Sequence, residues 1–226
     1  METSLHRQLK EHYAQEGALL EQRVGRYRID VVNGRRLVEI QLSSLTAIRD
    51  KIAALVKEHS VVLVKPIIAQ KCLVKRKRKG GREVSRRRSP KQGKLLDLFD
   101  ELVHFTRVFP HRRLTLEVPM ISIEEWRYPG HGRRRWRRPG DFLVEDQLLV
   151  EVIEVHRFRR AADLCRLLPS GLPKPFHTGH LAEGLGIQRW IAQRMAYCLR
   201  NMGGVEVVGK QRGALLYTKT GRKAAA

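Results

Sequence analysis

The chain of 226 residues has little cysteine, few aromatic residues and no long apolar run. Its three cysteines, Cys72, Cys165 and Cys198, form no Cys-x-x-Cys pair, so we expect reduced thiols rather than disulfides or a zinc site. No segment approaches the roughly 18 consecutive apolar residues of a membrane-spanning helix. Residues 1–15 also lack the apolar core of a secretory signal. We therefore expect a cytoplasmic protein that makes no membrane contact.

The sequence also lacks the motifs that bind nucleotides. It contains no phosphate-binding Gly-Lys-Ser/Thr loop, no dinucleotide fingerprint and no Gly-x-Ser-x-Gly elbow around a nucleophilic serine. His177 and His180 are three residues apart, but no cysteine or acid completes a zinc set. We expect no nucleotide cofactor.

Acidic residues are scarce relative to basic ones. The 45 lysines and arginines against 23 aspartates and glutamates give a net charge of +22, which argues for a polyanionic partner, with nucleic acid as the first candidate. The basic residues are most concentrated in residues 71–94, which we expect to form either a mobile loop or a long hairpin that follows phosphates. A merely solvated loop is the alternative. The nucleic-acid contacts expected here are Lys75, Arg76, Lys77, Arg78, Lys79, Arg86, Arg87 and Arg88.

A second basic insertion, residues 126–138, mixes aromatic residues with arginines. Aromatic rings stack on bases while arginines hold phosphates, so this composition also indicates nucleic-acid binding. The alternative is that the tryptophans anchor a basic loop to the core. The contacts expected are Arg133, Arg134, Arg135 and Trp136.

Acidic side chains gather on one predicted hairpin, residues 26–41, which turns at Asn33-Gly34. Asp30, Glu39 and Gln41 share one face in either of two registers, because side chains on a strand repeat every second residue. In one register Asp30 faces Leu37, and in the other it faces Glu39. Two carboxylates held this close are typical of a divalent-cation site, since Mg²⁺ and Mn²⁺ prefer oxygen ligands. The alternative is an ordinary amphipathic hairpin whose polar face is exposed to solvent.

The remaining apolar patterns predict an α/β fold. The order of elements indicates a mixed sheet flanked by helices, whose fourth strand joins in parallel through a right-handed crossover. We expect helices over residues 2–15, 45–58 and 95–109, strands over 19–23, 61–64 and 113–123, and a second hairpin over 142–155 that turns near residues 145–147.

The combination of Glu2, Asp30 and Glu39-x-Gln41 in a helix–hairpin–helix–strand order resembles the PD-(D/E)XK nuclease superfamily, which includes restriction endonucleases. The resemblance covers residues 1–68. It implies that Glu2, Asp30, Glu39 and Gln41 are catalytic, and that Asp30, Glu39 and the carbonyl of Ile40 hold Mg²⁺ or Mn²⁺. The sequence departs from the family pattern in two places, because Ile29 replaces the proline and Gln41 replaces the lysine.

The C-terminal pattern is similar to a winged helix-turn-helix domain. We expect helices over residues 161–168 and 188–202, a helix N-capped by Thr178 between them, and a hairpin over 205–219. The likeness implies that the last helix enters the DNA major groove and that the hairpin tip meets the backbone. The contacts it implies are Gln188, Arg189, Gln193, Arg194, Lys210 and Arg212. A winged helix used for protein contacts is the alternative.

These expectations combine into two domains. Residues 1–158 would form the restriction-endonuclease-like domain with its basic insertions, and residues 159–226 the winged helix. The leading hypothesis is a metal-dependent DNA endonuclease or nickase of repair, recombination or defence, which acts on double-stranded or branched DNA. Its active form would be either a monomer or a homodimer. A catalytically inactive nuclease-fold protein that binds DNA through its winged helix is the second hypothesis. An RNA-binding protein is the third.

Overall fold

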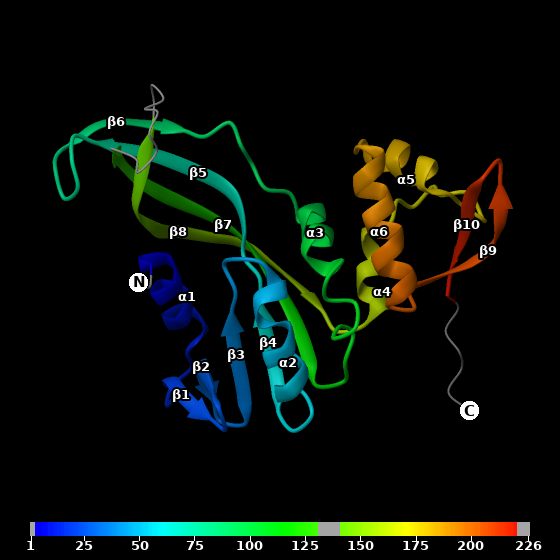
Figure 1. Ribbon diagram of the computed structural model, residues 1–226, viewed down its shortest axis with the longest axis horizontal. Coiled ribbons are helices and arrows are strands. Elements are labelled where there is room, and N and C mark those ends of the chain that lie inside the picture. Colours follow the sequence, from blue (N-terminus) through cyan, green and yellow to red (C-terminus); the bar gives the residue numbers. More distant parts are fainter. Residues whose placement is uncertain (1–2, 131–140, 221–226) are drawn as a thin grey trace. The chain divides into compact units, whose positions relative to one another are not determined.

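The computed structural model describes residues 3–130 and 141–220, and its contacts divide the chain into two compact units (Figure 1). Unit 1 comprises Met1–Leu42, Val64–Leu95 and Val118–His156. Unit 2 comprises Ser43–Leu63, Leu96–Glu117 and Arg157–Ala226. Each unit is therefore assembled from segments that lie far apart in the sequence.

The larger sheet has eight strands among the described residues, with β8 (Phe142–Phe158) beside β7. The strands β1 and β2, β2 and β3, and β5 and β6 pair antiparallel, whereas β5 and β7 pair in parallel. The structure is thus α/β with a mixed sheet flanked by helices, which confirms this part of the sequence prediction. The other strands follow the order β1 (Leu19–Val24), β2 (Tyr27–Asn33), β3 (Arg36–Ile40), β4 (Ser60–Val64), β7 (Leu114–Pro129), β5 (Ile67–Arg76) and β6 (Glu83–Arg88).

Helix α1 (Ser4–Tyr13) belongs to unit 1 and lies against β2 and β3. Thr3 caps its start by accepting a hydrogen bond from the backbone N–H of His6, and Leu5 and Leu9 are fully buried one turn apart. Its contacts with β8 fix it further, since the Gln8 side-chain oxygen accepts a hydrogen bond from the backbone of Leu149 at 2.8 Å.

Two of the helices predicted from the sequence belong to unit 2 and are short. The predicted helix 45–58 is divided into η1 (Leu45–Ile48) and α2 (Arg49–Leu55). The predicted helix 95–109 contains only η2 (Leu95–Asp97) and α3 (Leu98–Leu102), followed by turns. Phe105 and Phe109 are fully buried in those turns, so burial of the aromatic rings outweighs the local helical pattern.

The second hairpin predicted over residues 142–155 is wrong, because β8 runs without a turn from Phe142 to Phe158. The acids predicted to form its turn lie within β8, and their carboxylates are hydrogen-bonded to residues of other elements. The Glu145 carboxylate accepts a hydrogen bond from Arg76 at 3.0 Å, and Asp146 accepts two from Ser4. No glycine, proline or asparagine interrupts the strand.

The first basic insertion forms a hairpin, which is one of the two expected arrangements. Strands β5 and β6 pair from Cys72 with Arg88 to Arg76 with Glu83, and the residues between them make the turn (Figure 1). All six residues of β6 are exposed. This hairpin belongs to unit 1 and places alternate basic side chains on opposite faces.

The C-terminal part of unit 2 contains α4 (Ala161–Leu164), η3 (Cys165–Leu167), α5 (Thr178–Leu185), α6 (Arg189–Asn201), β9 (Val205–Gln211) and β10 (Ala214–Lys219). Strands β9 and β10 pair antiparallel, and an isolated bridge joins Phe176 to Tyr217 of β10. The predicted N-cap Thr178 is wrong by one residue, since the His177 ring accepts hydrogen bonds from the backbone of Gly179 and His180. Across the described residues, the helices are too short or too polar to span a membrane.

Candidate functional site

The acidic hairpin adopts the register in which Asp30 faces Glu39. Val31 pairs with Val38 and Asn33 with Arg36, so the turn residues are Gly34 and Arg35 rather than Asn33 and Gly34. Gly34 has φ of +58°, the left-handed conformation that glycine adopts readily.

The side chain of Asn33 explains why this register is adopted. Its amide nitrogen donates to the carbonyl of Tyr13 at 2.9 Å, and its oxygen accepts from the backbone N–H of Gln15 at 3.1 Å. These bonds hold Asn33 at the end of β2, next to the end of α1. The turn therefore begins one residue later than the sequence predicts.

A third acid extends the row across β1. Leu20 pairs with Val31 and Gln22 with Ile29, so Glu21 lies opposite Asp30. Glu21 has φ of +56°, a conformation that costs on the order of 1–3 kcal/mol for a residue with a side chain. Three adjacent strands thus carry Glu21, Asp30 and Glu39 at neighbouring positions. Sequence reasoning missed Glu21, although the acid lies at the centre of the predicted first strand.

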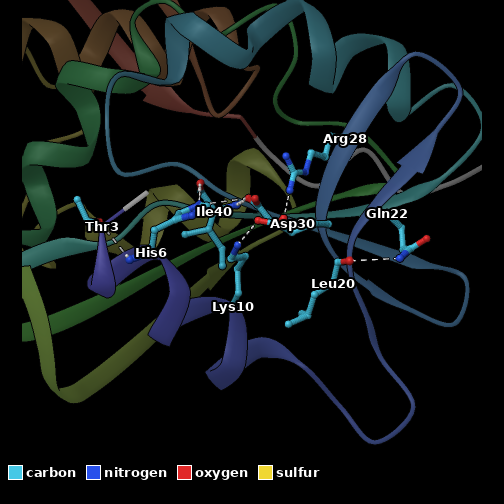
Figure 2. Close-up of polar contacts among 9 residues, drawn as sticks. Thr3, His6, Lys10, Leu20, Gln22, Arg28, Asp30 and Ile40 are labelled. Carbon is cyan, nitrogen blue, oxygen red and sulfur yellow. Dashed lines mark hydrogen bonds and ion pairs between the residues drawn. The ribbon is translucent and has the colours of Figure 1, made fainter. Parts of the chain in front are cut away.

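Helix α1 directs two basic side chains toward this acidic row. Figure 2 shows His6 and Lys10, which are one turn apart on the helix, projecting toward the strands. The Lys10 ammonium is buried and lies 2.5 Å from a carboxylate oxygen of Glu21, which also binds Arg28. The His6 Nε2 atom lies 3.1 Å from the Ile40 carbonyl oxygen and 3.5 Å from an Asp30 carboxylate oxygen. Sequence reasoning did not anticipate these contacts of His6.

The two predicted metal-binding carboxylates differ in their surroundings. The Asp30 side chain is 19% exposed, and its Oδ2 atom accepts a hydrogen bond from the backbone N–H of Ile40 at 2.8 Å. Glu39 is buried, with 4% exposure. The third predicted ligand, the Ile40 carbonyl oxygen, is in contact with His6. Among the described residues, no group of three or more His, Cys, Asp or Glu side chains is placed to hold a metal ion.

A lysine that the sequence pattern did not reveal lies next to Gln41. The backbone N–H of Gln41 donates to the carbonyl of Val64 at 2.9 Å, which brings the end of β3 beside residues 64 and 65. Lys65 is buried, with 7% exposure, and its ammonium lies 3.5 Å from the Leu42 carbonyl oxygen. The only sequence signal for it was its position directly after the apolar run 61–64.

Some predicted site residues lie outside the described residues. They are Glu2, at the start of the helix that the sequence predicts, and Arg133, Arg134, Arg135 and Trp136 of the second basic insertion.

The part of the second insertion that is described favours the anchoring interpretation for Trp126. The Arg76 guanidinium lies 3.7 Å from the centre of the Trp126 ring, and the indole N–H donates to Glu124 at 3.1 Å. Both polar contacts are made within the protein.

Most of the predicted nucleic-acid contacts on the β5–β6 hairpin are exposed. Arg76 differs, since it is half-buried and bonded to Glu145. Arg86 is exposed, but it forms ion pairs with Glu83 and Glu124 that raise the pKa of its guanidinium. The other exposed basic residues are Lys75, Lys77, Arg78, Lys79, Arg87 and Arg88.

A buried carboxylate fixes the base of this hairpin. Glu125 of β7 is 3% exposed and accepts hydrogen bonds from Lys71 at 2.6 Å, Gln147 at 2.9 Å and Arg127. Burial alone would raise the pKa of Glu125, but these hydrogen bonds and the positive charge of Lys71 outweigh burial and lower it. Glu125 is therefore a charged structural residue.

The predicted recognition helix, α6, presents polar and aromatic side chains. Gln188, Arg189 and Gln193 are exposed, as are Lys210 and Arg212 on the β9–β10 hairpin. Arg194 is half-exposed, but its guanidinium donates to Asp100 of α3 at 2.6 Å and lies 4.7 Å from the centre of the Trp190 ring.

Comparison with known proteins gives a family and one relative. A family model described as "Domain of unknown function (DUF8091)" matches residues 3–159. A protein of Treponema pallidum (strain Nichols) described as "Uncharacterized protein" is 29% identical over 221 residues, which cover 96% of this chain and 85% of the relative. No solved structure matches the chain.

Proposed function

We propose that this chain, which belongs to the DUF8091 family, is a metal-dependent DNA endonuclease with a PD-(D/E)XK-like site. The observation that carries the proposal is the register of the acidic hairpin. Continuing the β2–β3 register from Val31 and Val38 sets Asp30 opposite Glu39 on neighbouring strands, next to α1. In an ordinary amphipathic hairpin with a solvent-exposed polar face, Glu39 would be exposed rather than buried beside a second carboxylate.

The donor atoms fit a hard cation. Two carboxylates and a backbone carbonyl supply oxygen ligands, which Mg²⁺ and Mn²⁺ prefer, and Asp30, Glu39 and Ile40 would hold the ion. When bound, such an ion lowers the pKa of a coordinated water and stabilises charge on a phosphate. The hydrogen bond from the Ile40 amide orients the Asp30 carboxylate. The His6 Nε2 atom contacts both the Ile40 carbonyl oxygen and the Asp30 carboxylate.

The family pattern has a lysine where this chain has Gln41, and we assign the role of that cation to the neighbouring Lys65. Gln41 can orient a water by hydrogen bonding, but it can carry no charge. The backbone contact between Gln41 and Val64 brings Lys65 to the same end of β3. In this proposal Lys65 stabilises the negative charge that develops on the phosphate, and Gln41 positions the attacking water.

DNA would be held by the basic surfaces of both units. The exposed side chains of the β5–β6 hairpin follow phosphates, and α6 with the β9–β10 hairpin acts as a winged helix. The isolated bridge between Phe176 and Tyr217 supports this interpretation. It adds a short third strand between the first and second helices of the C-terminal segment, which is the order of elements in winged helices.

A DNA-binding protein without catalytic activity is the second candidate. The contact of His6 with the Ile40 carbonyl favours it, because that oxygen is already engaged by a protein group. The same basic surfaces would then bind DNA, and the acidic row would serve only to attach α1 to the sheet.

Cleavage of labelled DNA distinguishes the two candidates. Duplex, branched and single-stranded substrates would be incubated with Mg²⁺ or Mn²⁺ and either the native chain or Asp30→Asn. The asparagine keeps an acceptor for the Ile40 amide, so we expect the variant to fold and bind DNA but not to cut it. Tight binding without cutting by the native chain under either metal would instead establish the second candidate.

A further inference from the structure

A hollow of about 310 Å³ lies on one face of the β5–β6 hairpin, on the side that carries Arg87. This volume is at the lower end of the range of ligand pockets, roughly 300–1,000 Å³. All of the lining residues belong to unit 1: Leu73, Lys75, Ser85, Arg87, Arg127, Tyr128, Pro129, Asp141 and Phe142.

Strand pairing explains why these side chains meet. Leu73 pairs with Arg87, and Lys75 pairs with Ser85, so the two pairs share one face of the hairpin. Lys75 also pairs with Arg127 on the neighbouring strand β7. The hollow is therefore lined from three adjacent strands and closed at one end by Phe142.

One wall of the hollow is flat and aromatic. The Arg127 guanidinium lies 3.7 Å from the centre of the Phe142 ring and is held in place by its ion pair with Glu125. Phe142 is 46% exposed, so its ring is accessible to a ligand. A planar guanidinium stacked on an aromatic ring is a surface on which a nucleobase can stack.

The lining also carries two basic side chains. Lys75 and Arg87 are exposed, and neither side chain has an ion-pair partner among residues 3–130 and 141–220. Asp141 is the acid at the rim, and its carboxylate can accept hydrogen bonds from a sugar hydroxyl or from the amino group of a base. The hollow thus offers a stacking surface, two exposed basic side chains and an acceptor within the space of one nucleotide.

We propose that this hollow holds one unpaired nucleotide of a DNA substrate, with its base on the Arg127–Phe142 surface and its phosphate on Lys75 and Arg87. The inference rests on the proposed DNA-binding function and deepens it. A base paired within a duplex is stacked on its neighbours and cannot enter a one-nucleotide hollow. The substrate would therefore be DNA with a single-stranded end, flap or branch rather than an uninterrupted duplex.

The test compares two duplexes of identical sequence, one blunt and one with a three-nucleotide single-stranded overhang. Affinities would be measured by fluorescence anisotropy in EDTA, so that no cleavage occurs. Stacking of one base supports a preference of about tenfold for the overhang. A 2-aminopurine in the overhang would report stacking directly by the quenching of its fluorescence.

Arg87→Gln and its neighbour Arg88→Gln form a matched pair. Both remove one positive charge from an exposed position of β6, but Arg88 pairs with Cys72 and lies on the opposite face. We expect Arg87→Gln and Phe142→Ala to abolish the preference for the overhang. Arg88→Gln should weaken binding to both duplexes equally and leave the preference intact.

Three outcomes would overturn the inference: no preference in the native chain, equal effects of the two arginine variants, or no quenching of 2-aminopurine. Because the assay contains no metal, it is independent of catalysis. A preserved overhang preference in a chain that never cuts would overturn the nuclease proposal alone. Failure to bind any DNA would overturn both.

Discussion

Asp146→Asn should loosen α1 from the sheet and lower the stability of unit 1. The Asp146 carboxylate accepts hydrogen bonds from the Ser4 amide at 3.0 Å, the Ser4 hydroxyl at 2.5 Å and the Gln147 amide at 2.8 Å. Asparagine removes the charge and one acceptor oxygen. Hydrogen bonds to charged groups contribute about 1.5–3 kcal/mol each, so we expect a loss of about 2 kcal/mol at this half-buried position. In a chain of this length such a loss lowers Tm by about 4–8 °C.

The pH dependence of this loss identifies its cause. Burial alone would raise the pKa of Asp146, but hydrogen bonds from Ser4 and Gln147 and the charge of Arg7 outweigh burial and lower it. A carboxylate with a depressed pKa stabilises the fold above its unfolded pKa of about 3.9, and that contribution is lost as the pH falls through the folded pKa. The difference between the native chain and the variant should therefore be complete at neutral pH and disappear in acid.

Thermal unfolding of four chains measures this contact. The four chains are the native protein, Asp146→Asn, Ser4→Ala and the double variant. A fifth chain, Asp141→Asn at an exposed position, controls for the loss of one negative charge. The effects of the two single variants should sum to more than the effect of the double variant, because both act on one contact. Additive effects, or a Tm shift in the Asp141 control as large as that of Asp146→Asn, would refute the reasoning.

The remaining predictions concern catalysis, thiol reactivity and DNA binding. Lys65→Gln should lower the cleavage rate by about 100-fold or more without weakening DNA binding in EDTA. A loss of DNA affinity as large as the loss of cleavage rate would contradict a role for Lys65 at the phosphate. Burial raises the pKa of Cys198 to about 12. In the folded protein, iodoacetamide at pH 8 should therefore label half-buried Cys72 and spare Cys198. Equal labelling of the two cysteines, measured by mass spectrometry, would contradict this prediction. Asp100→Asn should free the Arg194 guanidinium and raise duplex affinity several-fold, and an unchanged anisotropy titration would remove Arg194 from the interface.

The fold class could be predicted from the sequence because its apolar patterns are local. The alternation around Asp30 and Glu39 places both acids on one face in either of the two predicted registers, and the structure adopts one of them. The register itself could not be predicted, since it depends on bonds between Asn33 and the end of α1, a contact that no local pattern contains.

Three parts of the structure depended on distant contacts and were missed for that reason. The acids of β8 resembled a turn, but Asp146 is bonded to Ser4, which lies 142 residues away in the sequence. In the sequence, Lys65 is simply the polar residue that follows the apolar run 61–64. Its place beside Gln41 follows only from the backbone hydrogen bond between Gln41, just after β3, and Val64, the last residue of β4. His6 reaches the Ile40 carbonyl only because α1 packs on the hairpin.

The most direct test of the proposed nuclease site is the metal-dependent cleavage rate of Glu39→Gln, measured under single-turnover conditions over a titration of Mg²⁺. Glu16→Gln, an exposed acid just after α1, is the matched control for the same loss of charge. We expect the control to cut DNA at the native rate, while Glu39→Gln binds DNA normally but does not cut it at any Mg²⁺ concentration. Cleavage by Glu39→Gln at the native rate and the native Mg²⁺ dependence would contradict the assignment of the acidic row as the catalytic site.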